Sequence, residues 1–155
     1  MTSRISTMVQ CQEYGAGAIV LKSLFEEQIV SNNPVLEHDK GMYFWYNDSL
    51  EYIRSISPYD GLNEYLGLIQ EAKKEVSIPV IASINCISEK GWVEFAKKIE
   101  QSGADALELN IAMLPYNASV KNEQIRDLHA SIVHSVCKTV SIPVSVKVSQ
   151  YYTNI

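Results

Sequence analysis

Two short phrases, each occurring twice, constrain the fold of this chain more than any other feature. Gly15-Ala-Gly-Ala18 and Gly103-Ala-Asp-Ala106 each precede a short apolar run, and so do Val76-Ser-Ile-Pro79 and Val140-Ser-Ile-Pro143. Glycine after a helix permits a left-handed cap, whereas proline cannot continue a helix and is tolerated at the first residue of a strand. Each phrase therefore predicts a helix end followed by a strand, and the strands fall at 18–23, 79–84, 105–110 and 143–148.

Apolar residues at helical spacing fill the segments between these strands. The stripes predict helices at 62–76, 92–99 and 123–140, with a weaker one at 5–14, and Ser88 is a good N-cap for the second. Their apolar members are Leu62, Tyr65, Leu66, Ile69, Ala72 and Val76, then Trp92, Phe95, Ala96 and Ile99, then Ile125, Leu128, Ile132, Val133 and Val136. Helices that alternate with short apolar strands indicate an α/β fold with a parallel sheet and right-handed crossovers.

The segment 26–59 interrupts this alternation and is too long for a simple strand-to-helix loop. It contains Met42-Tyr-Phe-Trp-Tyr46 and ends at Ser57-Pro58. We expect an excursion above the carboxyl ends of the strands, with a short helix near 48–55. Its aromatic residues either line a binding site or pack over the rim of the fold.

The composition fits one soluble globular domain over residues 1–155. Hydrophobic residues make up 46% and charged residues 20% of the chain, which excludes disordered and collagen-like proteins. The net charge of −5 gives no general attraction to nucleic acid or to anionic membranes. With no apolar run of membrane-spanning length and no signal peptide, we expect a cytoplasmic location. Cys11, Cys86 and Cys137 then predict small buried apolar residues rather than a metal or redox site.

Polar residues gather at the carboxyl end of every predicted strand, which is where α/β folds build their sites. They are Lys22 and Ser23, then Ser83 and Asn85, then Glu108 and Asn110, then Ser145, Lys147 and Ser149. One interpretation is a polar plug, in which both lysines pair with Glu108. The whole set favours a ligand site instead, because lysine, amide and hydroxyl groups suit a phosphate or the pyrimidine ring of a flavin.

Motifs for other ligands are absent from the sequence. No glycine-rich phosphate loop occurs, and Gly15-Ala-Gly-Ala18 precedes a strand instead of following one, so it is not a dinucleotide fingerprint. His38, His129 and His134 form no recognisable metal or catalytic triad pattern. We expect His129 and His134 to be surface or packing residues of the last helix.

Four segments in register resemble the dihydroorotate dehydrogenase family, in particular its dihydroorotate dehydrogenase-like branch. They are Gly15 to Glu27, Ile78 to Asn85, Gly103 to Asn110 and Pro143 to Ser149. The resemblance implies a TIM (β/α)8 barrel that carries FMN at the carboxyl ends of its strands. It also implies flavin contacts from Lys22, Ser23, Ser83, Asn110 and Lys147. Lys22 and Asn110 would also bind the small-molecule substrate, and Lys147 would stabilise negative charge on the reduced flavin.

Two departures from the family pattern limit this resemblance. The family carries a cysteine or serine base shortly after the fourth-strand asparagine, whereas here Met113 stands at that position, and methionine cannot take a proton. The asparagine-rich substrate loop of the family is not recognisable either. Tyr116 is a weak candidate for a replacement, so no catalytic residue is assigned.

The strand count is the second limit, because a complete (β/α)8 barrel needs about 250 residues and this chain predicts four strands. We therefore expect a partial barrel, corresponding to strands two to five of the family, and an inactive fragment. The parent function would be FMN-dependent hydride transfer from a small CH–CH substrate, related to pyrimidine biosynthesis. Alternatives are a non-catalytic flavin-fold relative, another flavin- or phosphate-binding barrel such as a dihydropyrimidine dehydrogenase or tRNA dihydrouridine synthase relative, and two half-barrels that assemble as a homo-oligomer.

Overall fold

The computed structural model describes residues 2–26, 61–86, 89–111 and 122–148. Helices and strands alternate along most of this part of the chain, as the repeated phrases predict. The elements are α1 (Ile5–Glu13), β1 (Ile19–Val20), β2 (Leu24–Phe25), α4 (Gly61–Glu75), β3 (Val80–Asn85), α5 (Glu89–Gln101), β4 (Ala106–Ile111), α6 (Asn122–Thr139) and β5 (Val144–Val148).

The strands form one parallel sheet in the order β1-β3-β4-β5, and β2 pairs with the carboxyl-terminal part of β3. Ser83 faces Glu108 across β3 and β4, and Asn110 faces Lys147 across β4 and β5. The predicted strand at 18–23 is therefore two short pieces, β1 and β2, that both lie against β3. The other three strands confirm the prediction to within one or two residues, and the arrangement is half of a TIM barrel.

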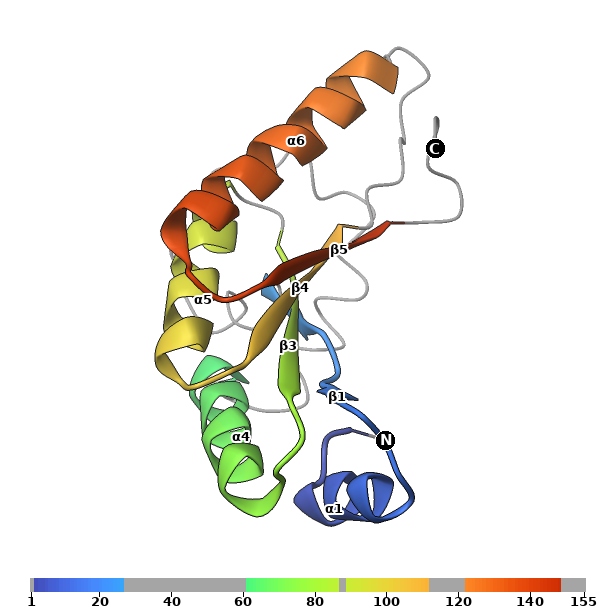
Figure 1. Ribbon diagram of the computed structural model, residues 1–155. Helices are drawn as coiled ribbons and strands as arrows, with labels where there is room; N and C mark the ends of the chain where they lie inside the picture. Colours follow the sequence, from blue (N-terminus) through green and yellow to red (C-terminus); the bar gives the residue numbers. More distant parts are fainter. Residues whose placement is uncertain (1, 27–60, 87–88, 112–121, 149–155) are drawn as a thin grey trace, which may run out of the picture.

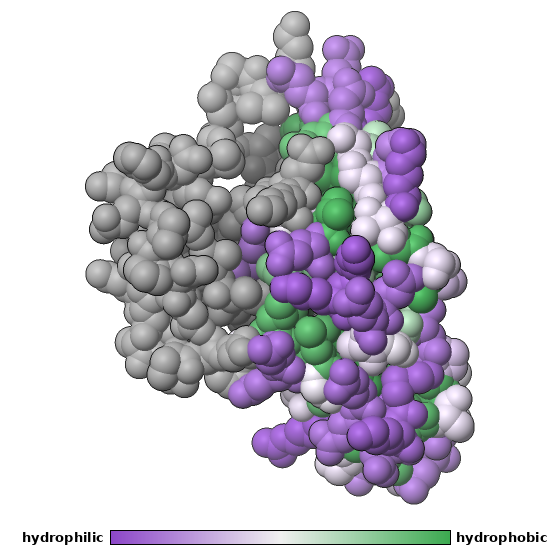
Figure 2. Space-filling view, turned by 90° about the vertical axis from the view of Figure 1, so that its left-hand side faces the viewer, coloured by the Kyte–Doolittle hydropathy of each residue, from purple (hydrophilic) through white to green (hydrophobic). Residues whose placement is uncertain are grey.

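Helices α4, α5 and α6 cover one side of the sheet, and α1 lies beside α4 near the start of β3 (Figure 1). Figure 2 views the molecule from the helical side, where hydrophilic residues predominate and hydrophobic ones show as smaller patches between them. This distribution is expected of amphipathic helices that turn their apolar stripes toward a sheet. The opposite side of the sheet is left for other residues.

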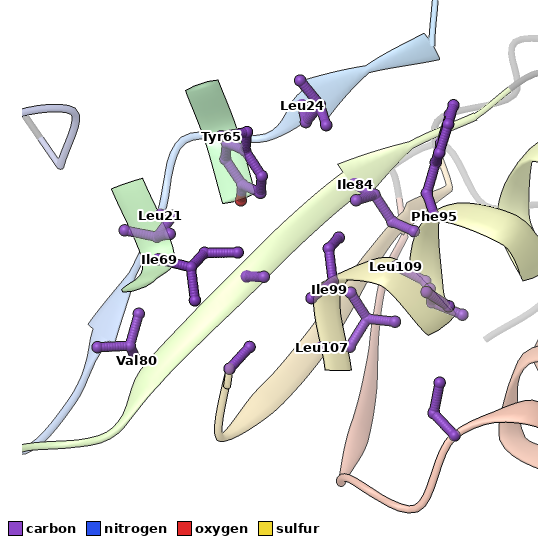
Figure 3. Packing of buried hydrophobic residues seen from close by; sticks show 14 of the residues in the cluster. Leu21, Leu24, Tyr65, Ile69, Val80, Ile84, Phe95, Ile99, Leu107 and Leu109 are labelled. Atoms are coloured by element: carbon purple, nitrogen blue, oxygen red, sulfur yellow. The ribbon is translucent and has the colours of Figure 1, made fainter. Parts of the chain in front are cut away.

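The core lies between the sheet and these helices (Figure 3). Alternate strand residues point into it, and the predicted helix stripes meet them. Its fully buried side chains include Val80, Ala82 and Ile84 of β3, Leu107 and Leu109 of β4, Ile69 and Ala72 of α4, and Trp92, Ala96 and Ile99 of α5. Burial of each large apolar side chain stabilises the fold by about 1.5–3 kcal/mol before entropy is subtracted.

The glycines and prolines of the repeated phrases do what the sequence predicts. Gly15 and Gly103 have φ of 88° and 93°, the left-handed conformation that glycine adopts without strain. The carbonyls of Pro79 and Pro143 accept hydrogen bonds from the amides of Ile19 and Leu107, at 2.8 and 2.9 Å. Each proline thus starts a strand by lending its carbonyl to the neighbouring one.

An ion pair fastens the amino-terminal end of the sheet. Lys73 Nζ of α4 contacts Asp105 Oδ2 at 2.7 Å, and the same carboxylate accepts a hydrogen bond from the Val80 amide at 2.7 Å. Burial alone would raise the pKa of Asp105, but the bonds from Lys73 and Val80 outweigh it and lower the pKa below its ordinary value. Asp105 therefore joins a helix to the starts of β3 and β4.

Two sequence predictions are wrong in detail. Leu128, placed on the apolar stripe of α6, is 43% exposed, because the first turns of that helix project beyond α5 (Figure 1). Cys137 is exposed and Cys11 is only half-buried, so only Cys86 is the buried cysteine that we expect. Cys137 follows the buried Val136 on α6, and one helical step turns it away from the core. His129 is a buried packing residue and His134 is exposed.

Several predictions lie outside the described residues. They are the excursion at 26–59 apart from Glu26, the N-cap at Ser88, His38, Met113, Tyr116 and Ser149. Over the helices that the structure describes, none is long and apolar enough to cross a membrane.

Candidate functional site

The side of the sheet opposite the helices carries a row of polar side chains, which we call the polar face. Because strand residues alternate, the positions of β3 and β4 between the core residues all point to this side. The members are Ser23, Ser83, Asn85, Glu108, Asn110, Ser145 and Lys147. They come from every strand of the sheet, so the fold brings together what the sequence separates by more than a hundred residues.

Hydrogen bonds join five of these side chains into one continuous line. Asn110 Nδ2 donates to Ser23 Oγ at 3.2 Å, and Ser23 Oγ contacts Ser83 Oγ at 2.7 Å. Ser83 Oγ donates to Glu108 Oε1 at 2.7 Å, and Lys147 Nζ donates to the same oxygen at 2.8 Å. Asn85 adds a bond to the Asn110 carbonyl at 2.8 Å. The line crosses the sheet from β2 to β5.

Glu108 is the negative charge of this line. Its side chain is 17% exposed, and that of Lys147 is 50% exposed. Burial raises the pKa of Glu108, but the hydrogen bonds from Lys147 and Ser83 and the lysine charge together bring the pKa below its ordinary value. The carboxyl is therefore an ionised acceptor at neutral pH and a poor proton acceptor for catalysis.

A one-residue bulge places Ser23 in the line. Ile19 pairs with Val80, but Leu24 pairs with Ile84, so the first strand holds one residue more than β3 over this stretch. Leu21 and Leu24 are both buried although they are three residues apart, and Lys22 and Ser23 between them are not. The extra residue interrupts strict alternation and lets Ser23 reach Ser83.

Tyr65 fills the gap that the bulge opens (Figure 3). Its hydroxyl accepts a hydrogen bond from the Ser83 amide at 2.8 Å and donates one to the Ser83 carbonyl at 3.1 Å. The amides of Ile19 and Leu21 bond to the carbonyls of Pro79 and Ile81, so a regular ladder would next use Ser83. Tyr65 thus supplies the partners that the neighbouring strand withholds.

The sequence gives only a weak signal for this role of Tyr65. It lies on the apolar stripe of α4, where a tyrosine is indistinguishable from a packing residue. A buried tyrosine usually finds a partner for its hydroxyl, and that expectation is the one clue available. Burial, opposed by the Ser83 bond and assisted by the nearby Glu108 charge, raises the pKa of Tyr65 far above its ordinary value.

The structure joins four of the five candidate flavin ligands. Ser23, Ser83, Asn110 and Lys147 belong to the line on the polar face. Lys22 is exposed, and within the described residues it makes no hydrogen bond or ion pair. The plug interpretation pairs both lysines with Glu108, and in this part of the chain only Lys147 does so.

The donors of the polar face fit the pyrimidine edge of a flavin. An ammonium group, a primary amide and two hydroxyls can give and accept hydrogen bonds at a ring that carries both carbonyls and an N–H. They do not fit a metal ion, since no cluster of three or more histidine, cysteine or acidic residues occurs among the residues described. Lys22, Ser23, Ser83, Asn110 and Lys147 are therefore the residues that would hold such a ring.

Comparison with known proteins identifies the family. The family model described as dihydroorotate dehydrogenase matches residues 50–155. The chain belongs to the dihydroorotate dehydrogenase family. It is 28% identical over 155 residues to the catalytic subunit of dihydroorotate dehydrogenase B (NAD(+)) from Thermoplasma volcanium, and 29% identical over 153 residues to that from Thermoplasma acidophilum. Each match covers 96% of this chain and 47% of the relative, so the chain spans about half of their length.

Solved structures support the fold of this family member. A dihydrodipicolinate synthase from Acinetobacter baumannii, crystallised with pyruvate, superposes with a TM-score of 0.52 at 19% sequence identity. The match covers 92% of this chain and 38% of that one. A dihydrodipicolinate synthase from Agrobacterium tumefaciens gives a TM-score of 0.50 at 14% identity. At these identities the likeness concerns the barrel fold alone.

Proposed function

We propose that the polar face is part of the FMN site of an oxidoreductase that oxidises a small CH–CH substrate, of the dihydroorotate dehydrogenase type, in pyrimidine biosynthesis. The observation that carries this proposal is the hydrogen-bonded line from Asn110 to Lys147 at the carboxyl ends of parallel strands. Bound FMN would accept a hydride from the substrate. Family membership supports the same function.

The residues of this chain would bind and orient rather than react. Lys147 would place a positive charge where negative charge develops, which is the usual electrostatic contribution of such a group. Asn110 and Ser23 would fix the ring by hydrogen bonds, and Lys22 would reach the substrate from the exposed side. Because the chain spans about half of its relatives, we propose that it binds flavin without turning over substrate.

Flavin titration of the purified chain tests this proposal. We expect the fluorescence of added FMN to be quenched on binding, and Lys147→Met to weaken binding about tenfold, as loss of a charged hydrogen bond predicts. The matched control is Lys98→Met, because Lys98 also pairs with a glutamate at 2.8 Å and is similarly exposed, but lies on α5. Equal affinities of the two variants, or no quenching at any FMN concentration, would contradict the proposal.

A second candidate function is flavin binding without substrate oxidation even in the whole protein. It is favoured by the state of the two titratable groups nearest the line. Glu108 is held ionised with a lowered pKa, and the Tyr65 hydroxyl is buried and bound to the Ser83 backbone. Neither is a good proton acceptor at neutral pH. Anaerobic bleaching of the yellow flavin band on adding dihydroorotate to the whole protein would reject this candidate.

A further inference from the structure

Glu108 occupies the centre of the polar face, and one of its oxygens serves two donors. Oε1 accepts from Ser83 Oγ at 2.7 Å and from Lys147 Nζ at 2.8 Å. Neither the resemblance nor the composition of the site assigns this carboxylate a role toward a ligand. Its position between the hydroxyl line and the lysine suggests that it acts on both.

The charge of Glu108 decides the direction of every hydroxyl proton in the line. An ionised carboxylate can only accept, so the single proton of Ser83 Oγ points at Glu108. Ser83 Oγ is then the acceptor in its contact with Ser23 Oγ, and the Ser23 proton must point at Ser83. Asn110 Nδ2 donates to Ser23 in the same sense. All protons therefore run from Asn110 toward Glu108.

This direction determines what the face presents to a ligand. Ser23 Oγ accepts one bond from Asn110 and donates its own proton, which leaves it an acceptor lone pair. The Lys147 ammonium spends one of its three donors on Glu108 and keeps two. A face with a fixed acceptor at Ser23 and fixed donors at Lys147 suits a ring that carries both an N–H and carbonyl oxygens.

The ion pair also limits where Lys147 can be. A half-exposed lysine has a flexible four-carbon stem and loses rotamer entropy when it binds a ligand. The contact with Glu108, whose side chain is 17% exposed, orders the ammonium before any ligand arrives. A ligand that contacts Lys147 then gains affinity because less ordering remains to be done.

We propose that Glu108 is a positioning residue, which holds the Lys147 ammonium and aligns the hydroxyls of Ser83 and Ser23 for the edge of a planar, imide-like ring. The proposal rests on the function proposed above, since it takes the flavin pyrimidine ring as the ligand. Glu108 itself touches neither flavin nor substrate in this role. It acts through Lys147 and through the serine line.

A measurement without ligand tests the arrangement. Carbon NMR titration of labelled glutamate carboxyls follows Glu108 in the wild type, in Lys147→Met and in Ser83→Ala. We expect its pKa to lie below the ordinary value in the wild type and to rise in both variants, since each loses a bond that stabilises the ionised form. Tyr65 is the other titratable group beside Glu108, and it stays neutral throughout the titration. A Glu108 pKa that is unchanged in both variants would overturn the proposal.

A double-mutant cycle with FMN tests whether Glu108 acts through Lys147. We expect Glu108→Gln to weaken FMN binding about fivefold in the wild-type background and less than about twofold in the Lys147→Met background, as coupling between contacting residues predicts. Equal losses in the two backgrounds would mean that Glu108 acts independently, and would overturn the positioning role. Thermal denaturation shows which variants are folded, and Lys147→Met, at an exposed position, keeps the carboxyl titration decisive if Glu108→Gln does not fold.

Asp105→Asn provides the matched control in the cycle. It removes a carboxylate next to the start of the same strand, also paired with a lysine at 2.7 Å, but at the opposite end of the sheet. We expect it to lower stability and to leave FMN affinity unchanged. If wild-type protein binds no FMN, the proposed function fails, and the carboxyl titration alone then decides whether Glu108 orders Lys147.

Discussion

Replacing Tyr65 by phenylalanine tests the bulge and its hydroxyl plug directly. The change removes one oxygen atom and keeps the ring, which is 8% exposed and packs in the core. It leaves the amide and the carbonyl of Ser83 without their partner, at a residue that is fully buried. Each such buried polar group costs about 1–3 kcal/mol when it is left unsatisfied. We therefore expect a loss of about 2–4 kcal/mol in the free energy of unfolding.

Urea denaturation followed by circular dichroism measures this loss. For a chain of this size the urea slope is about 2 kcal/mol per molar, so the midpoint should fall by about 1–2 M. The matched control is Tyr14→Phe, because Tyr14 is 91% exposed and should change stability by less than about 0.5 kcal/mol. Amide exchange of Ser83 should also accelerate in Tyr65→Phe, since its amide loses its only printed-chain partner across the bulge.

The pH dependence of stability provides an independent check on Tyr65. Its folded pKa is raised above the ordinary value of about 10, mainly by burial. A raised folded pKa means that this contribution to stability is full below the unfolded pKa and is lost as pH rises above it. Wild-type protein should therefore lose stability at alkaline pH more steeply than Tyr65→Phe. A phenylalanine variant as stable as the wild type, with the same alkaline slope, would refute the account of the bulge.

Two further predictions concern the ends of β4 and α4. The folded pKa of Asp105 is lowered, so its contribution to stability is present above the unfolded value, about 4, and is lost as pH falls through the folded one; Asp105→Asn should flatten the acid side of the stability profile measured by urea denaturation. Gly103→Ala should lower the free energy of unfolding by about 1–2 kcal/mol, because Gly103 has φ of 93°. Gly67→Ala, on α4 with no atom within 4 Å of the added Cβ, should raise it by about 0.5–1 kcal/mol, and opposite signs would contradict the assignment.

Local sequence signals were sufficient for the order of helices and strands. Glycine and proline act through their own backbone geometry, so Gly15, Gly103, Pro79 and Pro143 mark element ends without help from distant residues. The apolar stripes of α4 and α5 are buried as predicted because both helices lie on the sheet. Leu128 fails the same test because its burial depends on what lies beside the first turns of α6, which periodicity does not encode.

The polar face was predictable as a set and not as a network. Alternation within β3, β4 and β5 places Ser83, Glu108, Asn110 and Lys147 on one side of the sheet. The order in which they bond depends on register between strands, and register is a property of the folded sheet. Ser23 joins only because of the bulge, whose signal in the sequence is two buried leucines three residues apart. Whether these residues bind flavin stays a prediction.

The bulge also affects how this chain should be compared with its relatives. An alignment without a gap between Leu21 and Leu24 assumes that every family member has the extra residue there. A relative that lacks it would turn the residue in the Ser23 column to the other side of its sheet, even if that residue were a serine. Residue identity at this position is therefore informative about ligand binding only where the local chain length is the same.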